Sequence, residues 1–136
     1  PTAAKVQSCA CAALGNLACH TVGTAEHAQL EGVELVLAAL RAHTEEGEVQ
    51  ERGVGALQGL TCNCLPNRER VVQLGGIDLV SQAMLEYPAV ETIQSAGSIV
   101  LSRLAADSLS NCALLAAAPA AVLQAMSALP EDGHVQ

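Results

Sequence analysis

The chain has 136 residues, enough for one globular domain with a real core, and half of it is hydrophobic, which argues against intrinsic disorder. Its apolar residues are nearly all Ala, Leu, Val and Cys, with one Tyr and no Phe or Trp. Such residues favour closely packed helices over a β-sandwich. Lys and Arg number 6 against 14 Asp and Glu, and the net charge of −8 argues against nucleic acid and anionic membranes as partners. A basic protein partner is compatible with this charge, although an acidic surface mainly serves solubility.

No apolar run reaches the eighteen or so residues of a membrane span, and no secretory signal is apparent at the start of the sequence. The six cysteines, at positions 9, 11, 19, 62, 64 and 112, could form three disulfides in a small secreted domain. However, a chain of this size can fold without them, and several cysteines occupy places where Ala would serve. We therefore expect reduced thiols and an intracellular protein, cytoplasmic or also nuclear.

One dipeptide recurs along the chain. Val6-Gln7, Val49-Gln50 and Val135-Gln136 are identical, Ile93-Gln94 is a near copy, and the four starts are 43, 44 and 42 residues apart. A period in the forties predicts a helical repeat array. We interpret residues 1–136 as a single repeat domain of about three repeats, with starts near 6, 49 and 93. A fourth begins at 135, so we expect a segment of a longer array.

The opening segments of the three repeats, 6–18, 49–61 and 93–105, align without gaps. Leucines recur at the ninth and twelfth places, which lie on one stripe of a helix. The fifth place holds a small residue each time: Ala10, Gly53 and Gly97. We expect these small residues to let the backbones of stacked neighbouring helices approach closely.

A short helix and a second long helix are predicted to follow in each repeat. Thr24, Asn67 and Ser110 are the predicted N-caps of the short helices. A sharp corner is then predicted at Gly32 and Gly76, and at Pro119 in the third repeat. Apolar residues at helical spacing follow each corner, including those in "LEGVELVLAAL" (30–40) and "LGGIDLVSQAM" (74–84).

These segments resemble the armadillo repeat family. "LGGIDLVSQAM" is similar to its last two helices, and "CAALGNLA" (11–18) is similar to its third-helix signature. HEAT repeats are the nearest competitor, but they usually have two helices per repeat and less of the glycine corner. The armadillo resemblance implies an all-α fold, a right-handed α-solenoid of three-helix repeats. The helices that start at 6, 49 and 93 would line a concave groove that holds extended peptides in members of the family.

The resemblance also suggests which side chains face the groove. In the family's peptide-binding arrays a Trp and an Asn recur along it, and the Asn amide both donates to and accepts from the peptide backbone. Here the Asn place holds Asn16, Gly59 and Arg103, whereas the Trp place holds Ala12, Gly55 and Ile99. The recurring Trp and Asn pattern of a nuclear-import receptor, with its aromatic anchors, is therefore absent. The predicted partner-binding residues are Ser8, Asn16, Glu51, Ser95 and Arg103.

No constellation points to metal or catalysis. Cys9 and Cys11 point to opposite sides of a helix, so they cannot share an ion. A zinc site from Cys19, His20, Cys62 and Cys64 is unfavourable, because stacked equivalents stand ~8–10 Å apart and zinc needs sulfurs within about 4 Å. None of the four histidines is paired with a nucleophilic residue at a recognisable catalytic spacing. We therefore expect no metal site and no cofactor.

Two further stretches have structural interpretations. The glycines of "ERGVGALQGL" (51–60) lie inside a predicted helix, so they do not form a phosphate loop, and they serve packing or reflect drift. Arg68 and Arg70 in "PNRER" (66–70) are the only clustered basic residues, and we interpret them as a solvated face rather than an anion site.

Two functions remain open on these grounds, and an enzyme is not among them. The first is a non-catalytic scaffold that presents its groove to a partner protein or an extended peptide. The alternative is a structural spacer that stacks through its apolar ends within a larger protein, or associates end to end with other copies. Neither function requires nucleic acid or a membrane.

Overall fold

A computed structural model describes residues 2–20 and 26–117, and every secondary-structure element within these ranges is an α-helix. The helices are α1 (Thr2–His20), α2 (Glu26–Ala42), α3 (Gly47–Leu60), α4 (Leu65–Gln73), α5 (Gly76–Glu86), α6 (Glu91–Asp107) and α7 (Leu109–Ala116). The all-α class predicted from the sequence is thus confirmed. No helix in the described part of the chain is both long and apolar enough to cross a membrane.

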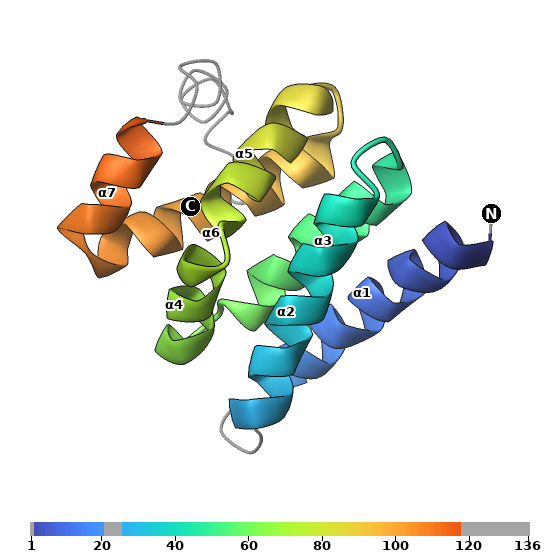
Figure 1. Cartoon of the computed structure of the whole chain (residues 1–136), viewed down its shortest axis with the longest axis horizontal. Coiled ribbons are helices and arrows are strands. Elements are labelled where there is room, and N and C mark those ends of the chain that lie inside the picture. The colour runs from blue at the N-terminus through green and yellow to red at the C-terminus, as the bar shows by residue number, and fades with distance from the viewer. Residues whose placement is uncertain (1, 21–25, 118–136) are drawn as a thin grey trace.

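The helices form two layers, with α2, α4 and α5 in front of α1, α3 and α6 (Figure 1). Helix α3 lies at the centre, where it packs against α1, α2 and α6. Its apolar stripe, which includes Val54, Leu57 and Leu60, is buried in one continuous core with residues from the other helices. The long helices α1, α3 and α6 begin at residues 2, 47 and 91, two to four residues before the predicted openings at 6, 49 and 93.

The predicted corner at Gly32 is wrong, because α2 runs through it as one helix. In the second repeat the corner is real, but it lies at Gly75, whose φ of 77° is left-handed, and Gly76 is already the first residue of α5. The residue aligned with Gly75 in the first repeat is Glu31. Only glycine adopts positive φ without cost, so a glutamate at this place favours a continuous helix. Pro119, the predicted corner of the third repeat, lies outside the described residues.

Two predicted N-caps are also wrong. The short helix α4 is preceded by Cys64 as its N-cap, and Asn67 lies inside the first turn. Helix α7 is capped by Ser108, whose hydroxyl accepts a hydrogen bond from the Asn111 N–H, and Ser110 lies within the helix. Thr24 falls outside the described residues. The sequence motif therefore indicated α4 and α7 but placed their starts two or three residues late, and the short helix predicted for the first repeat is part of the continuous α2.

The recurrent small residue has a different cause from the one expected. A Cβ on Gly53 would lie 2.5 Å from Leu40 Cδ2, and a Cβ on Gly97 would lie 2.7 Å from Met84 Sδ. The glycines thus make room for a large side chain of the preceding helix, not for a backbone. The close backbone approach occurs between α1 and α3, where a Cβ on Gly15 would lie 2.9 Å from Ala56 Cα.

The recurrent glutamine ties each long helix to the one before it. Gln50 Nε2 donates to the carbonyl oxygens of Leu40 (2.9 Å) and His43 (2.8 Å), at the end of α2. Gln94 Nε2 donates in the same way to Met84 (2.8 Å) and Tyr87 (3.1 Å), at the end of α5. The last carbonyls of a helix have no partner within it, so each amide satisfies one buried helix carbonyl, that of Leu40 or Met84. Its second bond goes to the turn that follows, where the His43 or Tyr87 carbonyl also accepts a backbone N–H.

We predict that Gln50→Ala lowers the free energy of unfolding by about 1–2 kcal/mol, because the buried Leu40 carbonyl loses its side-chain donor and the His43 carbonyl keeps only the Glu46 N–H. Gln7→Ala is the matched control. Gln7 occupies the same repeat position, but it is exposed in α1, so its loss should change stability by less than about 0.5 kcal/mol. Urea denaturation of dilute protein measures both. Equal effects would show that the amide contacts contribute nothing to stability.

Two glycines two residues apart in α3 should respond oppositely to alanine. Gly55→Ala should stabilise the protein by up to about 1 kcal/mol, because its Cβ would meet nothing within 4 Å and alanine is the better helix former. Gly53→Ala should destabilise it by about 1 kcal/mol, because the added methyl group displaces the buried Leu40. Thermal unfolding of the two variants checks the difference, and a stabilised Gly53→Ala would contradict this account of packing.

Candidate functional site

A groove of about 960 Å³ crosses α1, α3 and α6. These helices contain the three aligned segments that open at 6, 49 and 93, and they form the layer behind α2, α4 and α5 in Figure 1. Charged and polar residues alternate with small ones along its lining, which comprises Ala12, Gly15, Asn16, Glu48, Glu51, Arg52, Gly55, Ala56, Gln58, Gly59, Cys62, Thr92, Ser95, Ala96 and Arg103. Each of the three aligned sequence segments thus contributes one helix to the groove.

Four of the five residues predicted from the sequence line this groove: Asn16, Glu51, Ser95 and Arg103. Ser8 does not, because it is buried between α1 and α3, where its hydroxyl donates to Glu48 Oε1 at 3.2 Å. Its repeat equivalents Glu51 and Ser95 are half-buried, so one alignment place corresponds to two environments. The difference follows from the tight α1–α3 contact at Gly15.

Sequence reasoning missed several lining residues of α3 and the turn after it, notably Gln58 and Cys62. A signal for them existed. Steps of three and four residues from Glu51 lead to Gly55, Gln58 and Cys62, which therefore share its side of the helix. Applying helical spacing within one repeat would have found them, whereas comparison between repeats did not, because the three repeats hold unlike residues there.

The floor of the groove is formed largely by small residues of α3. Gly55 is exposed, and a side chain added to it would meet nothing within 4 Å. Ala56 and Gly59 lie beside it on the same helix. A floor without bulky side chains lets an extended chain approach the helix closely.

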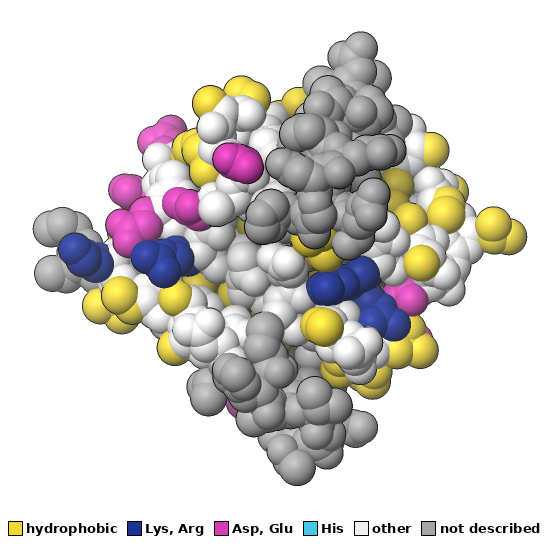
Figure 2. Space-filling model, turned by 180° about the vertical axis from the view of Figure 1, so that it is seen from behind, with side chains coloured by type: hydrophobic (Ala, Val, Ile, Leu, Met, Phe, Trp, Pro, Cys, Tyr) yellow, Lys and Arg dark blue, Asp and Glu magenta, His cyan; other side chains and the backbone are white. Residues whose placement is uncertain are grey.

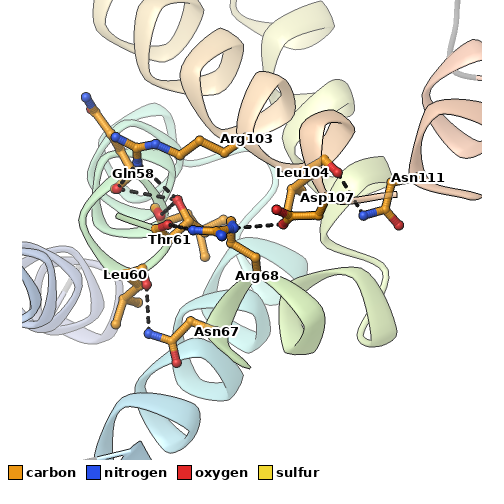
Figure 3. A network of polar contacts seen from close by, with 10 residues as sticks. Gln58, Leu60, Thr61, Asn67, Arg68, Arg103, Leu104, Asp107 and Asn111 are labelled. Atoms are coloured by element: carbon orange, nitrogen blue, oxygen red, sulfur yellow. Dashed lines mark hydrogen bonds and ion pairs between the residues drawn. The ribbon is translucent and has the colours of Figure 1, made fainter. Parts of the chain in front are cut away.

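Arg103 is occupied by an interaction within the protein. Its guanidinium Nη1 donates to the Gln58 carbonyl oxygen and to Thr61 Oγ1 (3.2 Å), so α6 reaches across to the end of α3 (Figure 3). A cation at a helix C-terminus is favoured by the helix dipole as well as by the hydrogen bonds. Arg103 therefore forms part of the groove wall and also holds α3 in place.

The same end of α3 receives two more donors from α4. Asn67 Nδ2 donates to the Leu60 carbonyl oxygen at 2.7 Å, and Arg68 Nη1 donates to that of Thr61 at 3.0 Å (Figure 3). The amide contact recurs in the next repeat, where Asn111 Nδ2 donates to the Leu104 carbonyl oxygen at 2.8 Å. Three neighbouring side chains thus satisfy the last carbonyls of the helix that forms the groove floor.

The interpretation of Arg68 and Arg70 as a solvated face is wrong for Arg68, which is largely buried in an ion pair, whereas Arg70 stays exposed although it too is paired. Arg68 Nε lies 2.7 Å from Asp107 Oδ2, which links α4 to the end of α6. Arg70 pairs with Glu34 of α2. Both arginines therefore join helices, because their guanidinium groups meet carboxylates that the fold brings from 36 or more residues away.

Charge is unevenly distributed on the face that carries the groove. Figure 2, which views the molecule from behind, shows acidic side chains gathered toward one edge and basic ones in two separate groups. The middle of the face is mostly backbone and uncharged polar groups. Within the groove, Glu51 Oε1 accepts a hydrogen bond from Thr92 (2.5 Å), which fixes the carboxylate between α3 and α6.

The described residues show no arrangement suited to metal chemistry. Cys9 is exposed and Cys11 is buried, as expected for residues on opposite sides of a helix, and burial raises the pKa of the Cys11 thiol. No group of three or more His, Cys, Asp or Glu side chains within the described part of the chain is placed to hold a metal ion. The side chains of Cys19 and His20 lie outside the described set.

Comparison with known proteins gives one partial relative. The chain is 35% identical over 92 residues to Protein aardvark of Dictyostelium discoideum. The match covers 62% of this chain but only 12% of that protein, so the chain spans a small part of its relative. No family model matches the chain, and no solved structure does.

We predict that Arg103→Ala lowers the free energy of unfolding by about 1–2 kcal/mol, because two hydrogen bonds at the end of α3 are lost. Arg103→Glu should cost more, because a carboxylate beside the last carbonyls is repelled by the helix dipole. The control is Arg52→Glu, an exposed groove residue away from a helix end, which should stay within about 0.5 kcal/mol. Urea denaturation separates them, and matching midpoints for Arg103→Glu and Arg52→Glu would refute this role of Arg103.

Proposed function

We propose that this chain is a segment of an armadillo-like α-solenoid, and that it binds an extended segment of a partner protein in the groove of α1, α3 and α6. The function is non-catalytic: a rigid helical surface is presented to a partner. The observation that carries the proposal is a groove to which successive repeats contribute equivalent helices, with its floor left open by Gly55.

The recurrence of specific contacts supports the solenoid. Gln50 and Gln94, 44 residues apart, make the same pair of hydrogen bonds. Asn67 and Asn111, also 44 residues apart, each donate to the carbonyl of the residue seven places earlier. In a repeat architecture each unit contacts only its neighbours, so the same interface is expected at each step. The first repeat departs from the three-helix pattern, because α2 continues without a break through the predicted corner at Gly32.

The groove's chemistry suits a peptide backbone better than a large apolar side chain. Asn16, Gln58 and Ser95 supply neutral donors and acceptors along it, while the floor offers small residues. An extended peptide leaves its N–H and C=O groups unpaired, so amide side chains are appropriate partners. The net charge of −8 favours a partner segment that carries basic residues, because opposite charges accelerate the encounter.

Filling the groove tests the proposal directly. Gly55→Leu should place a side chain into open space and reduce affinity for a groove-bound peptide at least about tenfold, which corresponds to about 1.4 kcal/mol. The fold should persist, because nothing lies near the new side chain. Ala38→Leu is the matched control, since it adds the same bulk at an exposed place on α2 in the other layer.

The peptides for this measurement would be selected from a random displayed library against the unmodified chain, and titrated by calorimetry. Peptides that bind Gly55→Leu and Ala38→Leu with equal affinity would place recognition elsewhere and refute the groove. Circular dichroism of both variants confirms that any loss of binding is not a loss of fold.

Polar recognition is tested by a second pair of substitutions. Asn16→Ala should weaken a selected peptide about threefold to tenfold, because the exposed amide no longer pairs with the peptide backbone. Gln82→Ala removes an exposed amide from α5, on the opposite layer, and should leave affinity unchanged. Calorimetric titration of both variants is the measurement, and equal losses would contradict a role for Asn16.

A further inference from the structure

The groove is lined by four charged side chains, and none of them takes part in an ion pair within residues 2–20 and 26–117. The ion pairs in that part of the chain join Arg68 to Asp107 and Arg70 to Glu34, and none of these residues lines the groove. The groove therefore presents charge of both signs that the described residues leave without a counter-charge. The four side chains are those of Glu48, Glu51, Arg52 and Arg103.

The two carboxylates are held in place by hydroxyl groups of the neighbouring helices. Ser8 Oγ of α1 donates to Glu48 Oε1 at 3.2 Å, and Thr92 Oγ1 of α6 donates to Glu51 Oε1. A neutral hydroxyl fixes a carboxylate but does not cancel its charge, and neither Oε2 atom is bonded to another described residue. Glu48 and Glu51 lie one turn apart near the start of α3. We call this pair the acidic flank of the groove.

The fixed cation of the groove lies toward the other end of α3. Arg103 Nη1 donates to the Gln58 carbonyl oxygen and to Thr61 Oγ1, which are both uncharged acceptors (Figure 3). Gln58 and Thr61 follow Glu51 by seven and ten residues, so the guanidinium lies about 10–15 Å from the acidic flank along the axis of α3. Small residues of the floor, including Gly55, separate the two charges.

Helix dipoles account for the sign of each charge but do not neutralise it. A dipole favours carboxylates at the start of a helix and cations at its end, yet each end carries only about half an elementary charge. Arg52 lies beside the acidic flank, but it is exposed and forms no ion pair with Glu48 or Glu51 in the described structure. Two carboxylates outnumber this one cation, so the acidic flank keeps a net negative charge.

We propose that the segment bound in the groove carries charges of both signs: a lysine or arginine that contacts the acidic flank, and an aspartate or glutamate that contacts Arg103. This inference rests on the proposed function, because it assumes that an extended segment occupies the groove. It goes further than the net charge of −8, which by itself favours a purely basic segment. Fixed charges of both signs also select one orientation of the segment, since reversing it would bring like charges together.

The geometry of an extended chain sets the spacing of the two charges. Successive side chains of such a chain point to opposite sides of its backbone. A segment that crosses α1, α3 and α6 therefore reaches the acidic flank with one set of alternate residues and Arg103 with the other. The basic and acidic residues of the segment should be separated by an odd number of positions.

Peptides selected from the displayed library test the acidic flank. Those whose affinity falls with Gly55→Leu are groove ligands, and they should be enriched in basic and acidic residues at odd separations. Replacing the basic residue with glutamine should weaken calorimetric binding about threefold to tenfold at low salt. Glu51→Gln should cause a similar loss, and both changes together should cost little more than either alone. Glu69→Gln is the matched control, because it removes the same charge from an exposed place on α4 outside the groove, and its effect should simply add.

The cationic contact is tested first on the peptide, which requires no change in the protein. Replacing the acidic residue with its amide should weaken binding to the unmodified chain about threefold to tenfold. The same replacement should have little effect on binding to Arg103→Gln, whereas its effect should persist with Arg103→Lys, which keeps the charge. Arg52→Gln is the control, since this exposed cation is not the expected partner of the acidic residue. Circular dichroism checks that the Arg103 variants are folded, and the measurement on the unmodified chain stands even if one of them is not.

The outcomes distinguish this inference from the proposed function on which it rests. Groove ligands that carry only basic residues, or no preferred charge, would overturn the inference and leave groove binding intact. Equal coupling of the peptide's basic residue to Glu51 and to Glu69 would also overturn it, as would an acidic residue whose removal changes nothing. A library that yields no peptide sensitive to Gly55→Leu would instead refute groove binding itself, and the charge pattern with it.

Discussion

The structure depends on side chains that satisfy the last carbonyls of its helices. Every α-helix ends with acceptors that have no partner within it, and at buried positions each unpaired acceptor costs about 1–3 kcal/mol. Here glutamine closes α2 and α5, asparagine closes α3 and α6, and arginine adds further donors to α3 and α4. Because the donor always comes from another helix, each closed end also fixes how two helices are placed.

This constraint explains how a sequence with few large residues specifies one arrangement. Helix α3 contains Gly47, Gly53, Gly55 and Gly59, so its intrinsic tendency to be helical is weak. It is stabilised instead by packing against α1, α2 and α6 and by side-chain donors at its C-terminal end. The same glycines allow Leu40 to pack closely and leave the groove floor open, so one compositional feature serves both packing and the proposed recognition surface.

The groove is the surface on which packing and the proposed recognition meet. It is lined by polar and small residues of three helices. Arg103 connects groove and fold, since the guanidinium that lines the groove also holds the end of α3. A partner that bound in the groove would therefore contact a rigid wall rather than a mobile cation.

Much of the fold could be read from the sequence, because helical periodicity and the recurrence after 43 or 44 residues are visible in the sequence itself. They indicated the all-α class and the long helices near 6, 49 and 93. The armadillo resemblance, together with helical spacing, supplied five candidate residues, and four of those five line the groove. Tertiary structure decided the rest. Whether Ser8 faces the groove depends on how closely α1 meets α3, and whether Arg68 is solvated depends on Asp107, 39 residues away. The recurrence of the glutamine could be seen in the sequence, but its role could not. That role depends on the helix-end carbonyls that the fold places beside Gln50 and Gln94.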